Sequence, residues 1–242
     1  MSDIDFKTAL RRGARDAIGI PAIILIGSMT GYGALAHDSG FGVGLAVLST
    51  VLIWGLPGQI AMAELYSAGA DLLAIAIAVA MANMRFFPMA VSLLPTFGAH
   101  SDTRLGRVMQ AQLMSATSWA YIMRSTAPRA AHARVGYHIG FAAVCLICAA
   151  ASTALGHYGA SGLPQPLALA LLFLNACFLL ILLVDVREHP ALVSIASGVV
   201  VGIPANIALP DTGLIVTGVV GGTIGFLVGE WRGRAQMDEE RP

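Results

Sequence analysis

Three polar side chains, Glu64, Asn83 and Arg85, interrupt apolar sequence and have the chemistry to hold or balance a carboxylate. An apolar run over residues 72–94 predicts a bilayer-spanning helix, with Arg85 roughly 3 Å along the axis from its midpoint. An arginine at the centre of a membrane helix costs roughly 2.5 to 3.5 kcal/mol, so Arg85 is expected to face a partner or a wet cavity. Two partners fit its planar fork. One is Glu64, in a structural or gating ion pair, and the other is a substrate carboxylate.

A helix-breaking sequence, Gly-Leu-Pro-Gly at residues 55–58, stands immediately before Gln59. Proline removes a backbone donor and glycine permits unwound backbone, so residues 41–54 form a helix too short to cross alone and a new helix begins near Pro57. The free N–H groups of that helix would favour a carboxylate inside the membrane. A simple packing kink explains the same residues equally well. The candidate substrate-binding residues are therefore Pro57, Gly58, Gln59, Asn83 and Arg85.

Composition predicts the kind of fold that positions these residues. Of 242 residues, 57% are hydrophobic and 12% are charged, against about 25% charged in ordinary soluble domains. Apolar runs near 20 residues recur, and further spans are expected at 17–36, 135–155 and 167–184. The prediction is an all-α, polytopic integral membrane helical bundle of about 7–8 transmembrane segments, with broken helices near Pro57 and Pro204.

A fourth span, expected over residues 108–123, is unusually polar. Gln110, Thr117 and Tyr121 recur in it at helical spacing. Lipid would not tolerate such a stripe, so it is expected to face other helices or a solute pathway. Hydrogen bonding between helices and lining of the pathway both remain open for these three residues.

One transmembrane domain is expected over residues 1–242, because the N-terminal segment 1–16 and the tail 231–242 are too short to bury cores of their own. No removable signal peptide is expected. With eight crossings, the distribution of basic residues places both termini in the cytoplasm, and seven crossings is the alternative. The basic residues then assigned to the inner side are Lys7, Arg11, Arg12, Arg15, Arg124, Arg129, Arg134, Arg187, Arg232, Arg234 and Arg241.

Signals for catalysis, metals and nucleic acid are weak. Cys145 and Cys148 lie in an apolar helix without histidines at metal spacing, so they are interpreted as packing residues, and no metal or cofactor is expected. Ser118 and His138 are the types found in a nucleophile and a base, but no spacing links them, so no catalytic residue is assigned. The chain has no basic, aromatic-interleaved patch, and nucleic acid is not an expected partner.

The motif residues resemble a known transporter family. They are Gly55-Leu-Pro-Gly-Gln59, Glu64-Leu65, Gly69-Ala70 and Asn83-Met-Arg85. Together they resemble the large subunit of the AzlC-type branched-chain amino acid exporters, the LIV-E family, most strongly between residues 19 and 125. The resemblance implies a multi-pass permease of the bacterial inner membrane that exports neutral, mainly aliphatic amino acids with a small AzlD-type membrane subunit.

The chain departs from the family pattern in two places. Family members usually show Phe-x-Gly-Ala-x-Gln where this chain has residues 54–59, and many carry an acidic pair where Ser118 and Trp119 stand. The second departure bears on proton coupling and on substrate choice. A passive small-solute channel is the main alternative function, since it explains small residues and polar helix faces, but it gains little from a near-central arginine. A membrane enzyme is less favoured, because the evidence for chemistry is thin.

Overall fold

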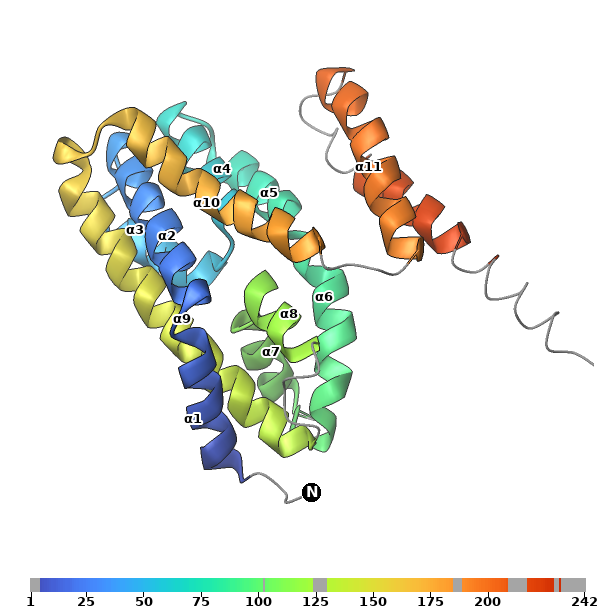
Figure 1. Ribbon diagram of the computed structural model, residues 1–242. Helices are drawn as coiled ribbons and strands as arrows, with labels where there is room; N and C mark the ends of the chain where they lie inside the picture. The colour runs from blue at the N-terminus through green and yellow to red at the C-terminus, as the bar shows by residue number, and fades with distance from the viewer. Residues whose placement is uncertain are drawn as a thin grey trace, which may run out of the picture. The chain divides into compact units, whose positions relative to one another are not determined.

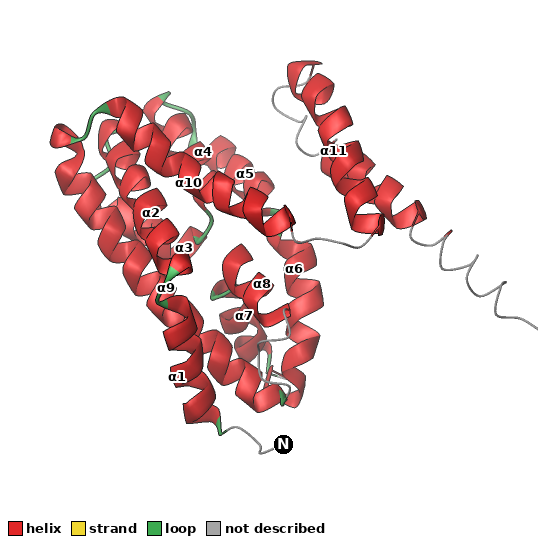
Figure 2. Ribbon diagram, in the orientation of Figure 1, coloured by secondary structure: helices red, strands yellow, loops and turns green. Residues whose placement is uncertain are grey.

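The structure of the chain is a computed structural model that describes residues 5–101, 103–123, 130–184, 189–208, 217–228 and 231. Helices make up all regular structure in these ranges, and Figure 2 shows no strand among them. The all-α prediction is therefore confirmed for the part of the chain that the structure describes. The elements are α1 (Phe6–Ala17), α2 (Ile20–Asp38), α3 (Val43–Ile53), α4 (Leu56–Ser67), α5 (Leu72–Asn83), α6 (Phe86–Leu93), η1 (Leu94–Ser101), α7 (Arg104–Gln112), α8 (Ala116–Met123), α9 (Ala131–Gly159), η2 (Ala160–Gly162), α10 (Gln165–Val184), α11 (His189–Ala208) and a helix at Thr217–Val228.

The chain divides into two compact units, Met1–Phe178 and Leu179–Pro242. In the second unit, Ser197 of α11 donates a hydrogen bond to the carbonyl oxygen of Gly221 over 3.4 Å, so α11 contacts the helix Thr217–Val228. All residues proposed as a site from the sequence lie in the first unit. The single-domain organisation stays a prediction.

Helix α9 is the long element of the first unit, and α1 and α2 run along it (Figure 1). These contacts are made through glycine. A Cβ at Gly33 of α2 would collide with the backbone of Thr153, and one at Gly140 of α9 would collide with the backbone of Leu10. Backbones approach this closely only where no side chain separates them. The expected spans at 17–36, 135–155 and 167–184 correspond to α2, α9 and α10.

The predicted break after residue 54 is present. Helix α3 ends at Ile53 and α4 begins at Leu56 with Pro57 in its first turn. Pro57 lacks an N–H, but a first-turn N–H would have no intrahelical partner in any case, so proline is well tolerated there. The short helix over 41–54 and the new helix near Pro57 are both confirmed.

The single helix expected over 72–94 is wrong. Helix α5 ends at Asn83, α6 begins at Phe86, and the two are bent by 50°. The cause is Pro88, which cannot donate to the carbonyl of Met84 four residues earlier and whose ring crowds that carbonyl. The N–H of Phe87 bonds to Met84 O instead, over 3.0 Å, and Met84 N bonds to Met81 O over 3.2 Å. These tighter bonds change the direction of the chain at the polar residues.

The single span expected over 108–123 is also wrong, because α7 ends at Gln112 and α8 begins at Ala116. Two serines stabilise the break. Ser118 Oγ accepts from the N–H of Ser115 over 2.9 Å, and Ser115 Oγ accepts from the N–H of Ser118 over 3.1 Å. This reciprocal pair satisfies donors that a continuous helix would have bonded internally.

The break expected near Pro204 is absent from the described chain, since α11 continues through Pro204 and ends at Ala208. A proline removes only one donor of its helix, and membrane helices tolerate this where neighbours satisfy the freed carbonyl. Two described helices, α2 and α9 with its η2 extension, are long and apolar enough to cross a membrane. The bent pair Leu72–Asn83 and Phe86–Gly98 would make a third if it is one span rather than a re-entrant loop. Shorter apolar helices account for other expected spans, and the number of crossings stays a prediction.

Candidate functional site

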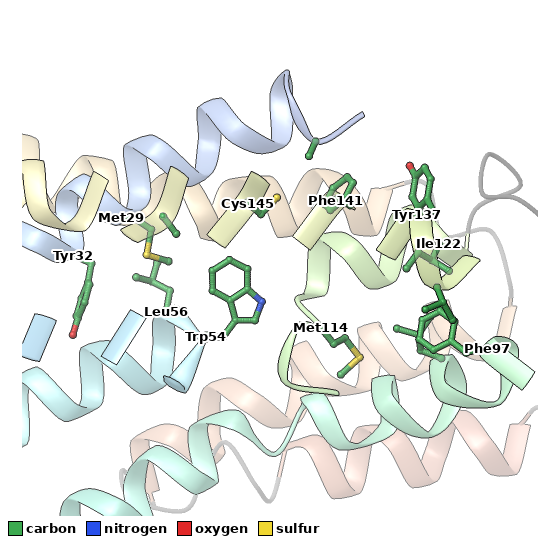
Figure 3. Packing of buried hydrophobic residues seen from close by; sticks show 14 of the residues in the cluster. Met29, Tyr32, Trp54, Leu56, Phe97, Met114, Ile122, Tyr137, Phe141 and Cys145 are labelled. Atoms are coloured by element: carbon green, nitrogen blue, oxygen red, sulfur yellow. The ribbon is translucent and has the colours of Figure 1, made fainter. Parts of the chain in front are cut away.

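Trp54 lies at the break between α3 and α4. Its backbone has φ 51° and ψ 28°, the left-handed region, and it is the one non-glycine among the described residues with positive φ. Its side chain is only 7% exposed and packs in the apolar core beside Leu56 and Cys145 (Figure 3). A bulky residue in this conformation is strained, so the surrounding contacts must hold the break in place.

Asn83, the last residue of α5, is one of those contacts. A Cβ built at Gly58 would lie 2.5 Å from Asn83 Nδ2, and a Cβ at Gly55 would collide with Asn83 Oδ1 and lie 2.9 Å from the ring of Phe86. The missing side chains of the two glycines thus create the space that the Asn83 amide fills. The structure therefore brings together Gly58 and Asn83, which the sequence analysis had assigned to one site.

Gln112, the last residue of α7, holds the other side of the break. Its Nε2 donates to the carbonyl oxygens of Val51 and Leu52 over 3.1 and 2.8 Å. The last carbonyls of a helix have no intrahelical donor, and this amide satisfies two of them. The ends of α5 and α7 therefore both meet the α3–α4 break. Neither Gln112 nor Trp54 is among the candidate residues expected from the sequence.

Arg85 lies in the α5–α6 break and is half-buried. Its guanidinium carbon is 5.2 Å from the centroid of the Phe86 ring, a cation–π contact. Glu64 is exposed, and these two described residues form no ion pair with each other. Glu64 lines a pocket of about 330 Å³ with Pro57 and Asn175, where α2, α4 and α10 meet.

Gln59 is fully buried and belongs to a network of hydroxyl groups. Its Nε2 donates to Thr50 Oγ1 over 2.9 Å, and Thr50 Oγ1 lies 3.0 Å from Thr153 Oγ1 of α9. The network joins α3, α4 and α9. The described contacts of Gln59 are with this network, whereas Gly58, the residue before it, contacts Asn83.

The three residues expected to line a pathway do not form one stripe, because the α7–α8 break separates Gln110 from the others. Gln110 is buried, and its Oε1 lies 2.7 Å from Nδ1 of His138. Tyr121 packs its ring 5.1 Å from that of Phe141, and Thr117 is half-buried. For Gln110 the contact is a hydrogen bond between helices, as one interpretation of the sequence had it.

An apolar pocket of about 450 Å³ lies beside Asn83, which is the polar member of its lining. The remaining lining residues come from α3, α4 and α5 and are aliphatic or methionine. They are Leu52, Ile53, Met62, Leu72, Ile75, Ala76, Val79 and Ala80. A branched aliphatic group matches such a lining.

Of six buried side-chain polar atoms without a hydrogen-bond partner among the described residues, four belong to residues at the α3–α4 and α5–α6 breaks. Trp54 Nε1 and Arg85 Nε are donors, whereas Gln59 Oε1 and Asn83 Oδ1 are acceptors. Buried polar groups are normally paired, so unpaired ones call for a specific explanation. Donors suit a carboxylate and acceptors suit an ammonium group. No cluster of three His, Cys, Asp or Glu side chains suited to a metal occurs in the described ranges.

A comparison with protein-family models found a match over the part of the chain that contains these residues. The model described as AzlC protein matches residues 21–163, more than half of the sequence. The match contains all three helix breaks of the first unit. No curated protein and no solved structure matched the chain.

Proposed function

Because the chain belongs to the AzlC family, we propose that it is a multi-pass permease of the bacterial inner membrane that exports neutral branched-chain or related amino acids. It acts as the large subunit of a two-component secondary transporter, together with a small AzlD-type membrane subunit. Both termini lie in the cytoplasm, as the basic residues favour. The observation that carries the proposal is the family match over residues 21–163, which includes Gly58, Asn83 and Arg85.

The chemistry at the breaks supports a zwitterionic substrate. The first N–H groups of α4 and the guanidinium of Arg85 are donors for the carboxylate. Asn83 Oδ1, buried and unpartnered, is an acceptor for the ammonium group. Since leaving such groups unpaired is costly in an apolar interior, a substrate that pairs with them offsets part of that cost. The pocket beside Asn83 provides aliphatic surface for the substrate side chain.

Glu64 has a separate role in this proposal. It pairs with Arg85 in a state of the transport cycle without substrate, so that the substrate carboxylate and Glu64 compete for one guanidinium. The side chain is exposed and free of an ion pair with Arg85 here, which is consistent with competition for Arg85 rather than a permanent bond. Coupled breaks in membrane helices are typical of secondary transporter sites.

Export from preloaded proteoliposomes tests the proposal. Vesicles containing this chain, with and without the small membrane protein, are loaded with radiolabelled leucine, isoleucine or valine, and efflux is followed. We expect saturable efflux that external unlabelled substrate stimulates by exchange, with full activity only when both proteins are present. Efflux that rises linearly with concentration and shows no exchange contradicts a transporter and indicates a passive channel.

A further inference from the structure

We propose that Trp54 is a substrate-binding residue, whose indole N–H donates a hydrogen bond to the carboxylate of the transported amino acid where the three helix breaks meet. The inference rests on the proposed function and extends its site by one residue.

Trp54 carries two unfavourable features at once. Its backbone is in the left-handed region although it has a large side chain, and its Nε1 is buried without an acceptor among the described residues. Strained backbone and unpaired buried donors both reduce stability, and both concentrate at functional sites. An oxygen supplied by a ligand removes the second of these costs.

A tryptophan elsewhere in the same unit shows what a structural role looks like. Trp119 of α8 donates from its Nε1 to Ser92 Oγ of α6 over 2.9 Å, which links the two helices. Trp54 makes no such link, although it is the more buried of the two. Its N–H is therefore available to a ligand in a way that the N–H of Trp119 is not.

The surroundings of Trp54 favour a carboxylate as that ligand. Its indole nitrogen lies on the edge of the ring that faces Met114, away from Leu56 (Figure 3). Met114 belongs to the α7–α8 break, and Gly55 contacts Asn83 and Phe86 at the α5–α6 break. An indole N–H donates only, so it can pair with a carboxylate oxygen but not with an ammonium group. The first turn of α4, which begins two residues later, presents further donors to the same charge.

The test replaces Trp54 by Phe, which keeps an aromatic ring and removes the donor. Leucine binding to the purified protein, and thermal unfolding without ligand, are both measured. A hydrogen bond to a charged group predicts affinity about tenfold to a hundredfold weaker. The unfolding temperature should fall less than it does for a tryptophan whose N–H is paired, because ring atoms are lost but no hydrogen bond is broken.

Trp119→Phe is the matched control. It removes an N–H that is paired within the protein, so it should lower the unfolding temperature and leave leucine affinity within twofold of wild type. Trp54→Phe should therefore have the larger effect on leucine affinity, and Trp119→Phe the larger effect on the unfolding temperature. If Trp54→Phe behaves like Trp119→Phe, Trp54 is a structural residue and the inference is wrong.

A second measurement avoids dependence on how Trp54→Phe folds. In the double variant Trp119→Phe with Trp231→Phe, Trp54 is the sole tryptophan. Leucine should change its fluorescence emission, whereas leucinol and leucinamide, which lack the carboxylate, should not. Unchanged emission at saturating leucine overturns the inference about Trp54 but leaves the proposed function standing. A wild-type protein that binds no neutral aliphatic amino acid overturns the proposed function and this inference with it.

Discussion

The side-chain amide of Asn83 occupies the space that a side chain at Gly58 would need, with Nδ2 2.5 Å from the position of the missing Cβ. The α3–α4 and α5–α6 breaks therefore pack against each other at this point, because glycine at position 58 leaves room for the amide of Asn83. The first prediction tests this fit.

Gly58→Ala should destabilise the protein by about 1 to 3 kcal/mol, because the added methyl group overpacks a filled site. It should also weaken leucine binding, since Asn83 must move. Thermal unfolding and ligand titration measure the two effects. Gly44→Ala, in α3, is the control: nothing lies within 4 Å of its built Cβ, so it should be neutral or slightly stabilising.

The double variant Gly58→Ala with Asn83→Ala separates packing from binding. Removing the amide makes room for the methyl group, so stability should return towards wild type while leucine affinity stays low. If adding Asn83→Ala restores no stability, a clash with Asn83 is not the cause of the destabilisation by Gly58→Ala.

Gln112→Leu should destabilise the protein by about 1 to 3 kcal/mol, because the carbonyls of Val51 and Leu52 lose their donor. Gln165→Ala, at an exposed position in the first turn of α10, should change unfolding by less than about 0.5 kcal/mol. Equal effects of the two substitutions would show that the cap on α3 contributes nothing measurable.

Thr50→Val should cost about 1 to 3 kcal/mol, since it keeps the shape of the side chain but removes the acceptor for Gln59 Nε2 and the contact with Thr153. Thr30→Val removes a bond only to the carbonyl of Ile26 in its own helix and should cost less. Unfolding of the detergent-solubilised protein compares them. A cost for Thr50→Val no larger than that for Thr30→Val contradicts a role for the network in joining the helices.

Arg85→Lys should weaken leucine binding, because an ammonium group keeps the charge but cannot reproduce the two-donor fork of guanidinium. Arg104→Lys, at an exposed position, should leave affinity unchanged. Binding titrations at one ionic strength make the comparison. If lysine at position 85 binds leucine as well as arginine does, the bidentate contact is excluded.

Glu64→Gln combined with Arg85→Gln distinguishes a substrate contact from a structural ion pair. The substrate interpretation predicts a well-inserted protein without leucine binding. Normal export and affinity in the double variant would show that neither charge belongs to the pocket.

Hydropathy was sufficient to predict the helical class and three long helices, because apolar runs such as 135–155 have few other stable outcomes in a membrane. The break at Pro57 was predicted as well, since two glycines and a proline act locally. The α5–α6 bend was not predicted, although Pro88 is evident in the sequence. Proline kinks some membrane helices and leaves others continuous, as α11 is at Pro204. Whether the helix breaks depends on partners for the freed carbonyls, which the local sequence does not specify.

Some residues of the candidate site could be recognised from the sequence, and others could not. Asn83 and Arg85 were recognisable because polar groups are expensive in apolar surroundings. Gln112 was not selected from the sequence, because it falls outside the helical stripe of Gln110, Thr117 and Tyr121. The partners of Gln112 and Gln110, the carbonyls of α3 and the ring of His138, are set by tertiary packing. Trp54 was hidden for another reason: an aromatic residue in an apolar run gives no sign that its N–H lacks an acceptor.

The 50° bend between α5 and α6 has a consequence for the lipid around the protein. At 1.5 Å per residue, the 25 residues of Leu72–Asn83 and Phe86–Gly98 make about 37 Å of helix, but the bend shortens their end-to-end reach to about 34 Å. A typical hydrocarbon core is about 30 Å thick. In a bilayer that the pair crosses as one span, hydrophobic mismatch would act on the bend: longer acyl chains would favour a straighter pair and shorter chains a more bent one. Acyl-chain length is thus a means of changing the angle at Arg85 without changing a residue.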